Sequence, residues 1–263
     1  MATDWIDIGV NLTSKRFDRD RDAVIEAARH AGVGHLIVTG TSVEESLGAL
    51  ALARQYPGML TATAGCHPHH ADGLDDEGLE RLRELQAQPE VVAVGECGLD
   101  YNRNFSTPEA QRRAFEAQLA QAVDAGKPVF LHERDAFDDQ IALLREFMPE
   151  LKGGVAHCFT GTEKELEAYL DLGLYIGITG WICDKRRGQP LFDIVGRVPD
   201  DRLLLETDAP YLLPHNLPEP PRDKRNAPAF LPWVAEKVAE ARKQSVEHLA
   251  WQTTRNARRL FGL

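Results

Sequence analysis

Residues 91–132 read VVAVGECGLDYNRNFSTPEAQRRAFEAQLAQAVDAGKPVFLH, and this stretch contains a complete strand–helix–strand unit. The apolar run Val91–Cys97 predicts a strand. Pro108–Ala125 predicts a helix, because a proline suits the first helical turn and the apolar side chains that follow share one face. Gly126 ends that helix, and Pro128–His132 predicts the next strand. Two strands joined through a helix lie parallel in one sheet, with a right-handed crossover.

The same alternation extends along the whole chain. The predicted strands are Trp5–Val10, His35–Thr39, Leu60–Cys66, Val91–Cys97, Pro128–His132, Gly154–Phe159, Leu174–Thr179 and Arg202–Asp208. Helices are predicted at Asp18–Ala31, Glu44–Gln55, Leu74–Gln86, Pro108–Ala125, Ala136–Phe147, Thr162–Leu172 and around Leu191–Val198, with two or three more in the tail Pro232–Leu263.

Eight such units in 263 residues match a closed (β/α)8 barrel, which typically has ~250 residues. We therefore predict an α/β fold, a single TIM-barrel domain spanning residues 1–263 with extra C-terminal helices. An open, doubly wound sheet is the alternative, but it predicts a glycine-rich phosphate loop after the first strand. Residues 9–13, GVNLT, do not form such a loop.

The composition places the chain among ordinary globular proteins. It is 43% hydrophobic and 27% charged, and it shows neither an apolar run long enough for a membrane helix nor a signal-peptide pattern at its start. Its four cysteines are widely spaced, which favours a reduced compartment. The net charge of −11 argues against a partner held by blanket positive charge, so a nucleic acid would need a local basic site. We expect a cytoplasmic monomer with no membrane association.

Polar side chains of the metal-ligand type stand at the ends of four predicted strands. These residues are Glu96, His132, His157 and Asp208. In a parallel barrel the carboxyl ends of the strands form the active site. Each residue alone has a structural explanation, such as a cap or a hydrogen-bonded histidine, but two imidazoles and two carboxylates together favour a divalent metal. Asp208 could also accept a proton from a water that the metal activates.

Three separated motifs resemble the TatD-type metal-dependent deoxyribonucleases, a family of amidohydrolase-like barrels. They are GECGLD at 95–100, HCFTG at 157–161 and ETDAPYL at 206–212. The resemblance covers essentially the whole chain. It implies a divalent-metal phosphodiesterase whose metal ligands are Glu96, His132, His157 and Asp208, with Glu96 and Asp208 catalytic. It also implies a 3′→5′ exonuclease that favours single-stranded DNA or RNA ends.

One part of the sequence departs from the wider family's pattern. Most members begin with Asp-x-His-x-His, whose histidines hold one metal of a pair, and Gly9 and Asn11 stand at the matching positions here. Glycine offers no ligand, and asparagine offers only an amide oxygen. The predicted cofactor is therefore Mg²⁺ or Mn²⁺, or one stable ion, in preference to a tightly held Zn²⁺ pair.

Further residues are candidates for substrate binding at the same mouth. The predicted substrate-binding residues are His67, Asn11, Arg186 and Arg225, the arginines coming from basic loops after strands 7 and 8. Aromatic side chains suited to stacking on bases are Tyr101, Phe105, Trp181 and Tyr211. The remaining expectations are that His69 and His70 are solvated, that Glu206 supports the site from below, and that Cys66, Cys97 and Cys158 face the helices.

Two other functions remain open at this point. A small-molecule amidohydrolase or esterase could use the same metal site, although strand 4 ends in Glu96 rather than in the lysine that such barrels often carboxylate. A non-catalytic nucleic-acid-binding barrel would not need all four ligand candidates. Cleavage of end-labelled single strands, with and without a chelator, separates the three.

Overall fold

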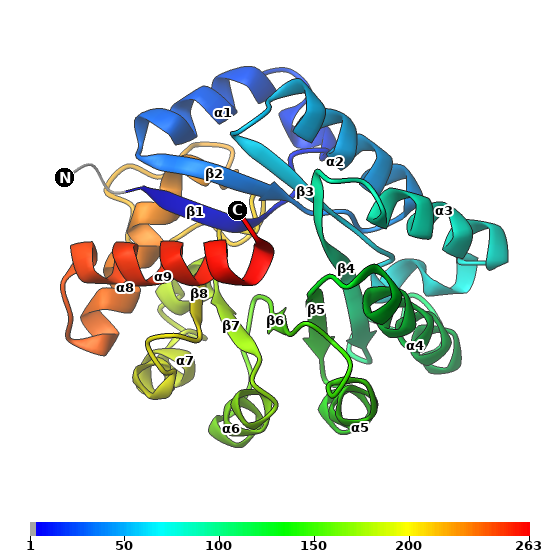
Figure 1. Ribbon diagram of the computed structural model, residues 1–263. Coiled ribbons are helices and arrows are strands. Elements are labelled where there is room, and N and C mark those ends of the chain that lie inside the picture. Colours follow the sequence, from blue (N-terminus) through cyan, green and yellow to red (C-terminus); the bar gives the residue numbers. More distant parts are fainter. Residues whose placement is uncertain (1–3) are drawn as a thin grey trace.

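The computed structural model describes residues 4–263 as eight parallel strands in a nearly closed barrel, with helices packed around the outside (Figure 1). The strands are β1 (Trp5–Val10), β2 (Val33–Val38), β3 (Leu60–Ala64), β4 (Val91–Asp100), β5 (Val129–Arg134), β6 (Gly154–Ala156), β7 (Tyr175–Ile178) and β8 (Leu203–Leu205). Each strand pairs with its neighbours in sequence.

The helices follow the strands in turn. They are α1 (Arg21–His30), α2 (Val43–Gln55), α3 (Asp76–Gln86), α4 (Pro108–Ala125), α5 (Phe137–Phe147), α6 (Glu163–Asp171), α7 (Gln189–Ile194), α8 (Leu231–Arg242) and α9 (Val246–Phe261). Short 3-10 helices are η1 (Lys15–Phe17), η2 (Pro68–Gly73), η3 (Gly180–Cys183), η4 (Val195–Arg197) and η5 (Pro228–Phe230). The predicted α/β barrel with additional C-terminal helices is confirmed, and β1 and α4 have the predicted bounds.

Strand ends differ most from the sequence prediction. The strands β6 and β8 stop before Cys158 and Asp208, because these residues have φ angles of 46° and 53°, which do not continue a β ladder. In contrast, β4 runs three residues beyond its predicted end at Cys97 and pairs there with β5. Gly98 permits this close approach, since a Cβ at that position would lie 1.9 Å from the carbonyl oxygen of His132.

Two helices begin later than predicted, and each follows a short 3-10 helix. The helix predicted from Asp18 begins at Arg21, with Asp20 at the N-cap position, and η1 precedes it. Similarly, η2 precedes α3, whose first turn is capped by Asp75, which accepts a hydrogen bond from the Gly78 N–H at 2.9 Å.

The barrel closes where β8 meets β1. Val10, the last residue of β1, forms a parallel bridge with Ala209, which lies beyond the end of β8. Backbone hydrogen bonds from Asn11 to Ala209 (2.8 Å) and from Asp208 to Gly9 (2.9 Å) extend this contact. These bonds hold the segment after β8 against the end of β1, and both segments lie at the carboxyl end of the barrel.

Apolar side chains fill the barrel interior and separate its two ends. The interior cluster includes Ile8, Phe130, Val155 and Leu204. Helix α9 closes the amino end of the barrel, where Ala257 and Phe261 join that cluster (Figure 1). A second, larger cluster fills the layer between the strands and the surrounding helices. Because the interior is packed, polar chemistry is confined to the opposite, carboxyl end.

Within residues 4–263, no helix has both the length and the apolar character needed to span a membrane.

The buried carboxyl group of Asp7 predicts a pH dependence of stability. It accepts a hydrogen bond from the Thr207 N–H at 2.9 Å, which links β1 to the segment after β8. Burial raises the Asp7 pKa to about 8. An unfolded aspartate ionises at about pH 4. Between these values the folded state holds a proton that the unfolded state lacks, so the stability contributed by this group falls as pH rises through that window.

Asp7→Asn should remove this contribution. The free energy of unfolding in urea, measured at about pH 5 and about pH 8, should fall less in the variant than in the wild type. If the free energy of unfolding fell at least as much in the variant as in the wild type between these two pH values, Asp7 would be ionised in the folded protein.

Candidate metal centre

A pocket of about 500 Å³ opens at the carboxyl ends of the strands, and we call it the metal pocket. Its lining includes all the metal-ligand candidates predicted from sequence, namely Glu96, His132, His157 and Asp208, together with Asn11 and His67. The fold therefore gathers six predicted site residues from distant parts of the chain into one cavity.

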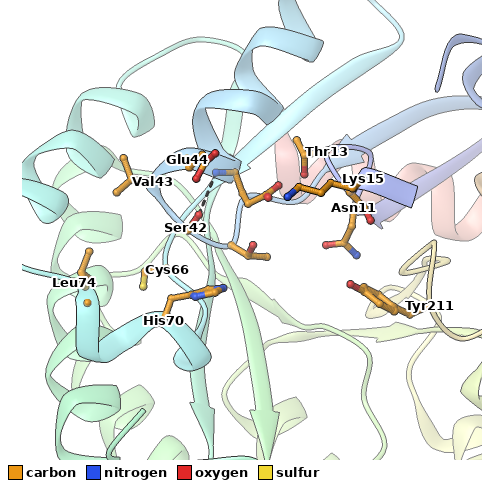
Figure 2. A pocket seen from close by; sticks show the side chains of 14 residues that line it. Asn11, Thr13, Lys15, Ser42, Val43, Glu44, Cys66, His70, Leu74 and Tyr211 are labelled. Carbon is orange, nitrogen blue, oxygen red and sulfur yellow. Dashed lines mark hydrogen bonds between the residues drawn. The ribbon is translucent and has the colours of Figure 1, made fainter. Parts of the chain in front are cut away.

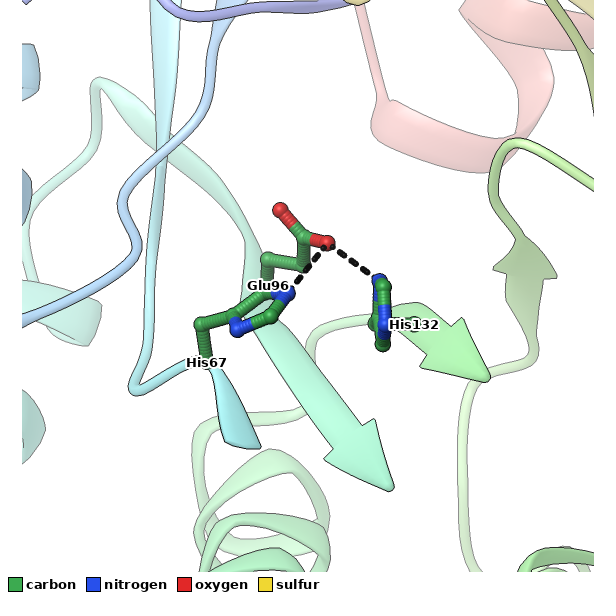
Figure 3. A group of neighbouring side chains, drawn as sticks. All are labelled: His67, Glu96 and His132. Carbon is green, nitrogen blue, oxygen red and sulfur yellow. Dashed lines mark hydrogen bonds and ion pairs between the residues drawn. The ribbon is translucent and has the colours of Figure 1, made fainter. Parts of the chain in front are cut away.

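The carboxylate of Glu96 stands at the centre of this group and is 5% exposed. Its Oε1 atom lies 3.0 Å from His132 Nδ1, 3.0 Å from His157 Nε2 and 3.4 Å from His67 Nε2. Figure 3 shows the rings of His67 and His132 directed at this oxygen. Burial disfavours the carboxylate charge, but the three imidazoles outweigh burial and hold the Glu96 pKa well below its usual range.

These separations fit the ligand sphere of a metal ion. Donor atoms at about 2.1 Å from one ion stand roughly 3.0–3.4 Å apart in octahedral or tetrahedral geometry. His67, Glu96 and His132 offer ligand atoms that all lie within 4.8 Å of one another, and His157 reaches the same Glu96 oxygen. Imidazole nitrogen and carboxylate oxygen are donors that divalent ions accept. The side chains present could therefore hold a divalent ion.

His157 is fixed between two carboxylates. Its Nε2 faces Glu96, and its Nδ1 lies 2.9 Å from Glu206 Oε2. The ring packs against Phe130, with the two ring centroids 4.8 Å apart. Burial opposes a charge on His157, but Glu206 and Glu96 raise its pKa well above the usual value. A divalent ion at Nε2 would compete with that proton, while Glu206 orients the ring.

The structure explains why glycine occupies position 9. A Cβ at Gly9 would lie 2.4 Å from Glu206 Oε2, so any larger side chain would displace that carboxylate. Glu206 is fully buried and accepts a hydrogen bond from the Cys158 N–H at 2.6 Å. Where the wider family's pattern has a histidine, this barrel instead has room for a carboxylate that reaches across from the segment after β8.

Asp208 faces the same pocket from the segment after β8. Its Oδ1 accepts a hydrogen bond from Asn11 Nδ2 at 2.8 Å. Burial raises the Asp208 pKa to about 7, with His157 acting in the opposite direction and the charges of Glu96 and Glu206 adding to the rise. A carboxyl group poised near neutral pH is suited to accept or release a proton.

The chain matches the TatD related DNase family over residues 6–262. It is a member of that family. The protein named 3′-5′ ssDNA/RNA exonuclease TatD in Erwinia tasmaniensis is 55% identical over 257 residues, covering 98% of this chain and 99% of the relative. The protein of the same name in Edwardsiella piscicida is 55% identical over 258 residues, with coverage of 98% and 99%.

Solved structures of TatD homologues share the fold. YJJV, a TatD homologue from Escherichia coli, matches with a TM-score of 0.91 at 31% identity, covering all of both chains. A TatD family hydrolase from Entamoeba histolytica matches with a TM-score of 0.88 at 26% identity, covering 99% of each chain. The family membership inferred from the three motifs is confirmed, and so is its implication of a hydrolytic enzyme.

The sequence did not place two residues, Asp100 and His69, in this TatD-family pocket. Asp100, which is buried, has its Oδ2 atom 3.3 Å from His132 Nε2 and 2.7 Å from His69 Nε2. The expectation that His69 is solvated is therefore wrong, whereas His70 is exposed as expected. The continued β pattern Gly98–Leu99–Asp100 was the signal that could have placed Asp100 at the strand end.

The expectation that three cysteines face the surrounding helices is right for two of them. Cys66 and Cys97 are buried in the apolar layer around the barrel. The expectation for Cys158 is wrong: this residue is half-buried and lines the metal pocket. Its φ angle of 46° breaks the strand alternation on which the expectation depended.

The basic loops do not line the metal pocket as a continuous groove. Arg225 donates to both carboxylate oxygens of Asp20, at 2.8 and 2.6 Å. Arg186 is exposed and follows Asp184, whose carboxylate accepts its backbone N–H at 2.8 Å. A role for Arg186 and Arg225 in substrate binding stays a prediction.

Metal binding at Glu96 can be tested by unfolding. A divalent ion at about 100 times its Kd should raise the free energy of unfolding of the wild type by about 2.7 kcal/mol. Glu96→Gln should lose most of this gain, because the central carboxylate oxygen and its charge are gone. The measurement is urea unfolding with and without Mn²⁺, monitored by far-ultraviolet circular dichroism.

Glu133→Gln is the matched control. Glu133 lines the same pocket, but its carboxylate accepts the Ala136 N–H at 2.8 Å instead of facing the histidines. This variant should keep the Mn²⁺-dependent gain. Equal gains in Glu96→Gln and the wild type would contradict a metal centre at Glu96.

Proposed function

We propose that this protein is a divalent-metal-dependent 3′→5′ exonuclease acting on single-stranded DNA or RNA ends. The observation that carries the proposal is the convergence of three imidazoles on Glu96 Oε1, beside Asp208, at the carboxyl end of the barrel. It occurs in a chain that is 55% identical, over 98% of its length, to a protein named for that activity.

The metal ligands we propose are Glu96, His132, His157 and Asp208. A bound divalent ion supplies charge stabilisation for the phosphoryl oxygens and lowers the pKa of a coordinated water. We propose Mg²⁺ or Mn²⁺ as that ion. Support comes from the positions where the wider family has its histidine pair, since Gly9 offers no ligand there and Asn11 offers at most an amide oxygen.

Asp208 is the proposed general base. Asn11 donates to Asp208 Oδ1, and Asp208 lines the metal pocket, so we propose that its second oxygen receives a proton from an attacking water. Burial raises the Asp208 pKa to about 7, and a divalent ion bound beside it would lower that pKa, so the carboxylate would be ionised and able to accept a proton at neutral pH. Asn11 therefore acts as a positioning residue that holds Asp208 toward the pocket.

His67 is proposed as a donor rather than a metal ligand. Its Nδ1 accepts the His69 backbone N–H at 3.1 Å, so the proton of the neutral ring is on Nε2, the atom that faces Glu96. Burial lowers the His67 pKa well below its usual value, which keeps the ring neutral. An Nε2–H in this pocket can donate to Glu96 or to a phosphate oxygen.

Asp208→Asn tests the proposed base. The substitution preserves size but removes the proton acceptor, so the single-turnover rate of cleavage should fall about 10²–10⁴-fold. Affinity for a 5′-labelled single strand should change much less. The measurement is single-turnover cleavage over a range of enzyme concentrations in Mg²⁺, with a chelator control and a blunt duplex as the poor substrate.

Asp138→Asn, at an exposed position on α5, is the matched control and should cleave at the wild-type rate. If affinity collapsed in Asp208→Asn while the chemical rate survived, Asp208 would be a binding residue instead. Wild-type protein that released no nucleotides from a single strand in Mg²⁺ or Mn²⁺ would contradict the proposed function.

A further inference from the structure

Two large apolar side chains beside the metal pocket are exposed. Phe105 is 63% exposed and Tyr211 is 54% exposed, and both line that pocket. Phe105 packs edge to face against His69, with ring centroids 4.8 Å apart. Exposed aromatic rings beside a phosphodiester site are suited to stacking on nucleobases, whatever the base sequence.

The other aromatic candidates in these loops are already engaged. The Tyr101 hydroxyl donates to Asp139 at 2.7 Å, and the side chain is half-buried. The Trp181 ring is covered by the guanidinium of Arg187, which lies 4.2 Å from the ring centroid. The structure therefore leaves Phe105 and Tyr211 with open faces at the pocket.

Tyr211 stands where the metal pocket joins a larger cavity. This second cavity, of about 770 Å³, lies between η1 and the start of α2, and we call it the upstream cleft. Its lining includes Asn11, Lys15, Ser42, Glu44, His70 and Tyr211. Figure 2 shows Lys15, Asn11 and Tyr211 along one wall and Ser42 and His70 along the other. Asn11, His70 and Tyr211 also line the metal pocket, so the two cavities adjoin at these residues.

The backbone that carries Tyr211 is held in place. The Tyr211 N–H donates to the Asp208 carbonyl at 3.0 Å, and Asn226 Nδ2 donates to the Tyr211 carbonyl at 2.7 Å. Asn226 is fully buried, and its Nδ2 also donates to the Thr207 carbonyl at 3.0 Å. The position of Tyr211 is therefore fixed relative to Asp208, three residues earlier in the chain.

The two walls of the upstream cleft carry opposite charges, and the positive wall is the one suited to a nucleic-acid backbone. Lys15 is exposed and lines one side, whereas Glu44 and Glu45 line the other at the start of α2. Phosphates gain from a cation and are repelled by carboxylates. A single strand in this cleft would thus run along Lys15, which lies on the same wall as Tyr211.

We propose that Tyr211 stacks on the nucleobase immediately 5′ of the scissile phosphate, and that the strand continues from there through the upstream cleft. This inference rests on the proposed function, since it takes the scissile phosphate to lie at Glu96 and Asp208. The terminal nucleotide then occupies the smaller metal pocket, where Phe105 is the exposed ring. The remaining strand leaves through the larger cavity, and Tyr211 is the exposed tyrosine ring that lines both cavities.

A double-mutant cycle between the protein and the substrate tests this assignment. The substrates are a 5′-fluorescent single strand and the same strand with an abasic tetrahydrofuran at the penultimate position. Affinity is measured by fluorescence anisotropy in a chelator, so that no cleavage occurs. For the wild type, removal of the penultimate base should weaken binding about 5- to 100-fold. For Tyr211→Ala, it should change affinity less than about twofold.

Two further Tyr211 variants separate stacking from packing. Tyr211→Phe keeps the ring and should behave like the wild type with both substrates. Tyr211→Leu keeps an apolar side chain without a ring and should lose the sensitivity to the abasic site. If the leucine variant kept that sensitivity, Tyr211 would contribute by packing, and the proposal would be overturned.

Trp251→Ala is the matched control. Trp251 is 58% exposed on α9, which binds the backbone at the amino ends of β1 and β8, since Thr254 donates to Asp4 and Asn256 donates to Leu203. In this variant, an abasic site at the penultimate position should weaken binding as much as it does in the wild type. Phe105→Ala should instead lose sensitivity to an abasic site at the terminal position.

The test also separates this proposal from the proposed function. If the wild type cleaves the strand but the effects of Tyr211→Ala and the abasic site are additive, the stacking assignment is wrong and the exonuclease remains. If the effects couple at the penultimate base but no cleavage occurs in Mg²⁺ or Mn²⁺, stacking stands and the proposed function fails. Coupling of Tyr211 to the terminal base would overturn the direction of the strand.

Discussion

A carboxylate buried at the end of a parallel barrel must be neutralised, and the architecture of this site follows from that requirement. Glu96 is almost inaccessible to water, and three imidazole nitrogens lie within 3.4 Å of its Oε1 atom. Removing any partner leaves part of a buried charge uncompensated, which is costly. The same crowding of donor atoms around one oxygen makes the group fit a divalent ion.

Other side chains hold the imidazole rings of His132 and His157 in place. Glu206 orients His157 from beneath, Asp100 contacts the outer nitrogen of His132, and Phe130 forms the apolar floor against which His157 packs. Gly9 belongs to this layer because its missing side chain leaves space for Glu206. Ligand rings held in this way keep their orientation before any ion or substrate binds.

The closure of the barrel couples stability to the site. Asp7 on β1 binds Thr207, and Asn226 binds the carbonyls on both sides of Asp208, at Thr207 and Tyr211. The segment after β8 is therefore held by buried hydrogen bonds rather than by a long strand ladder. It presents the proposed base and the proposed stacking residue from one short, fixed stretch of backbone, so a change in its anchoring should affect both.

The sequence by itself determined the alternation of strands and helices and the barrel it implies, because apolar periodicity and capping residues are local properties. It also determined that Glu96, His132, His157 and Asp208 gather, since parallel strands end at one face. Only the tertiary structure decided that β4 extends to Asp100, that Arg225 turns to Asp20, and which aromatic rings stay open. These outcomes depend on pairing and contacts between residues far apart in the chain, which local patterns do not encode.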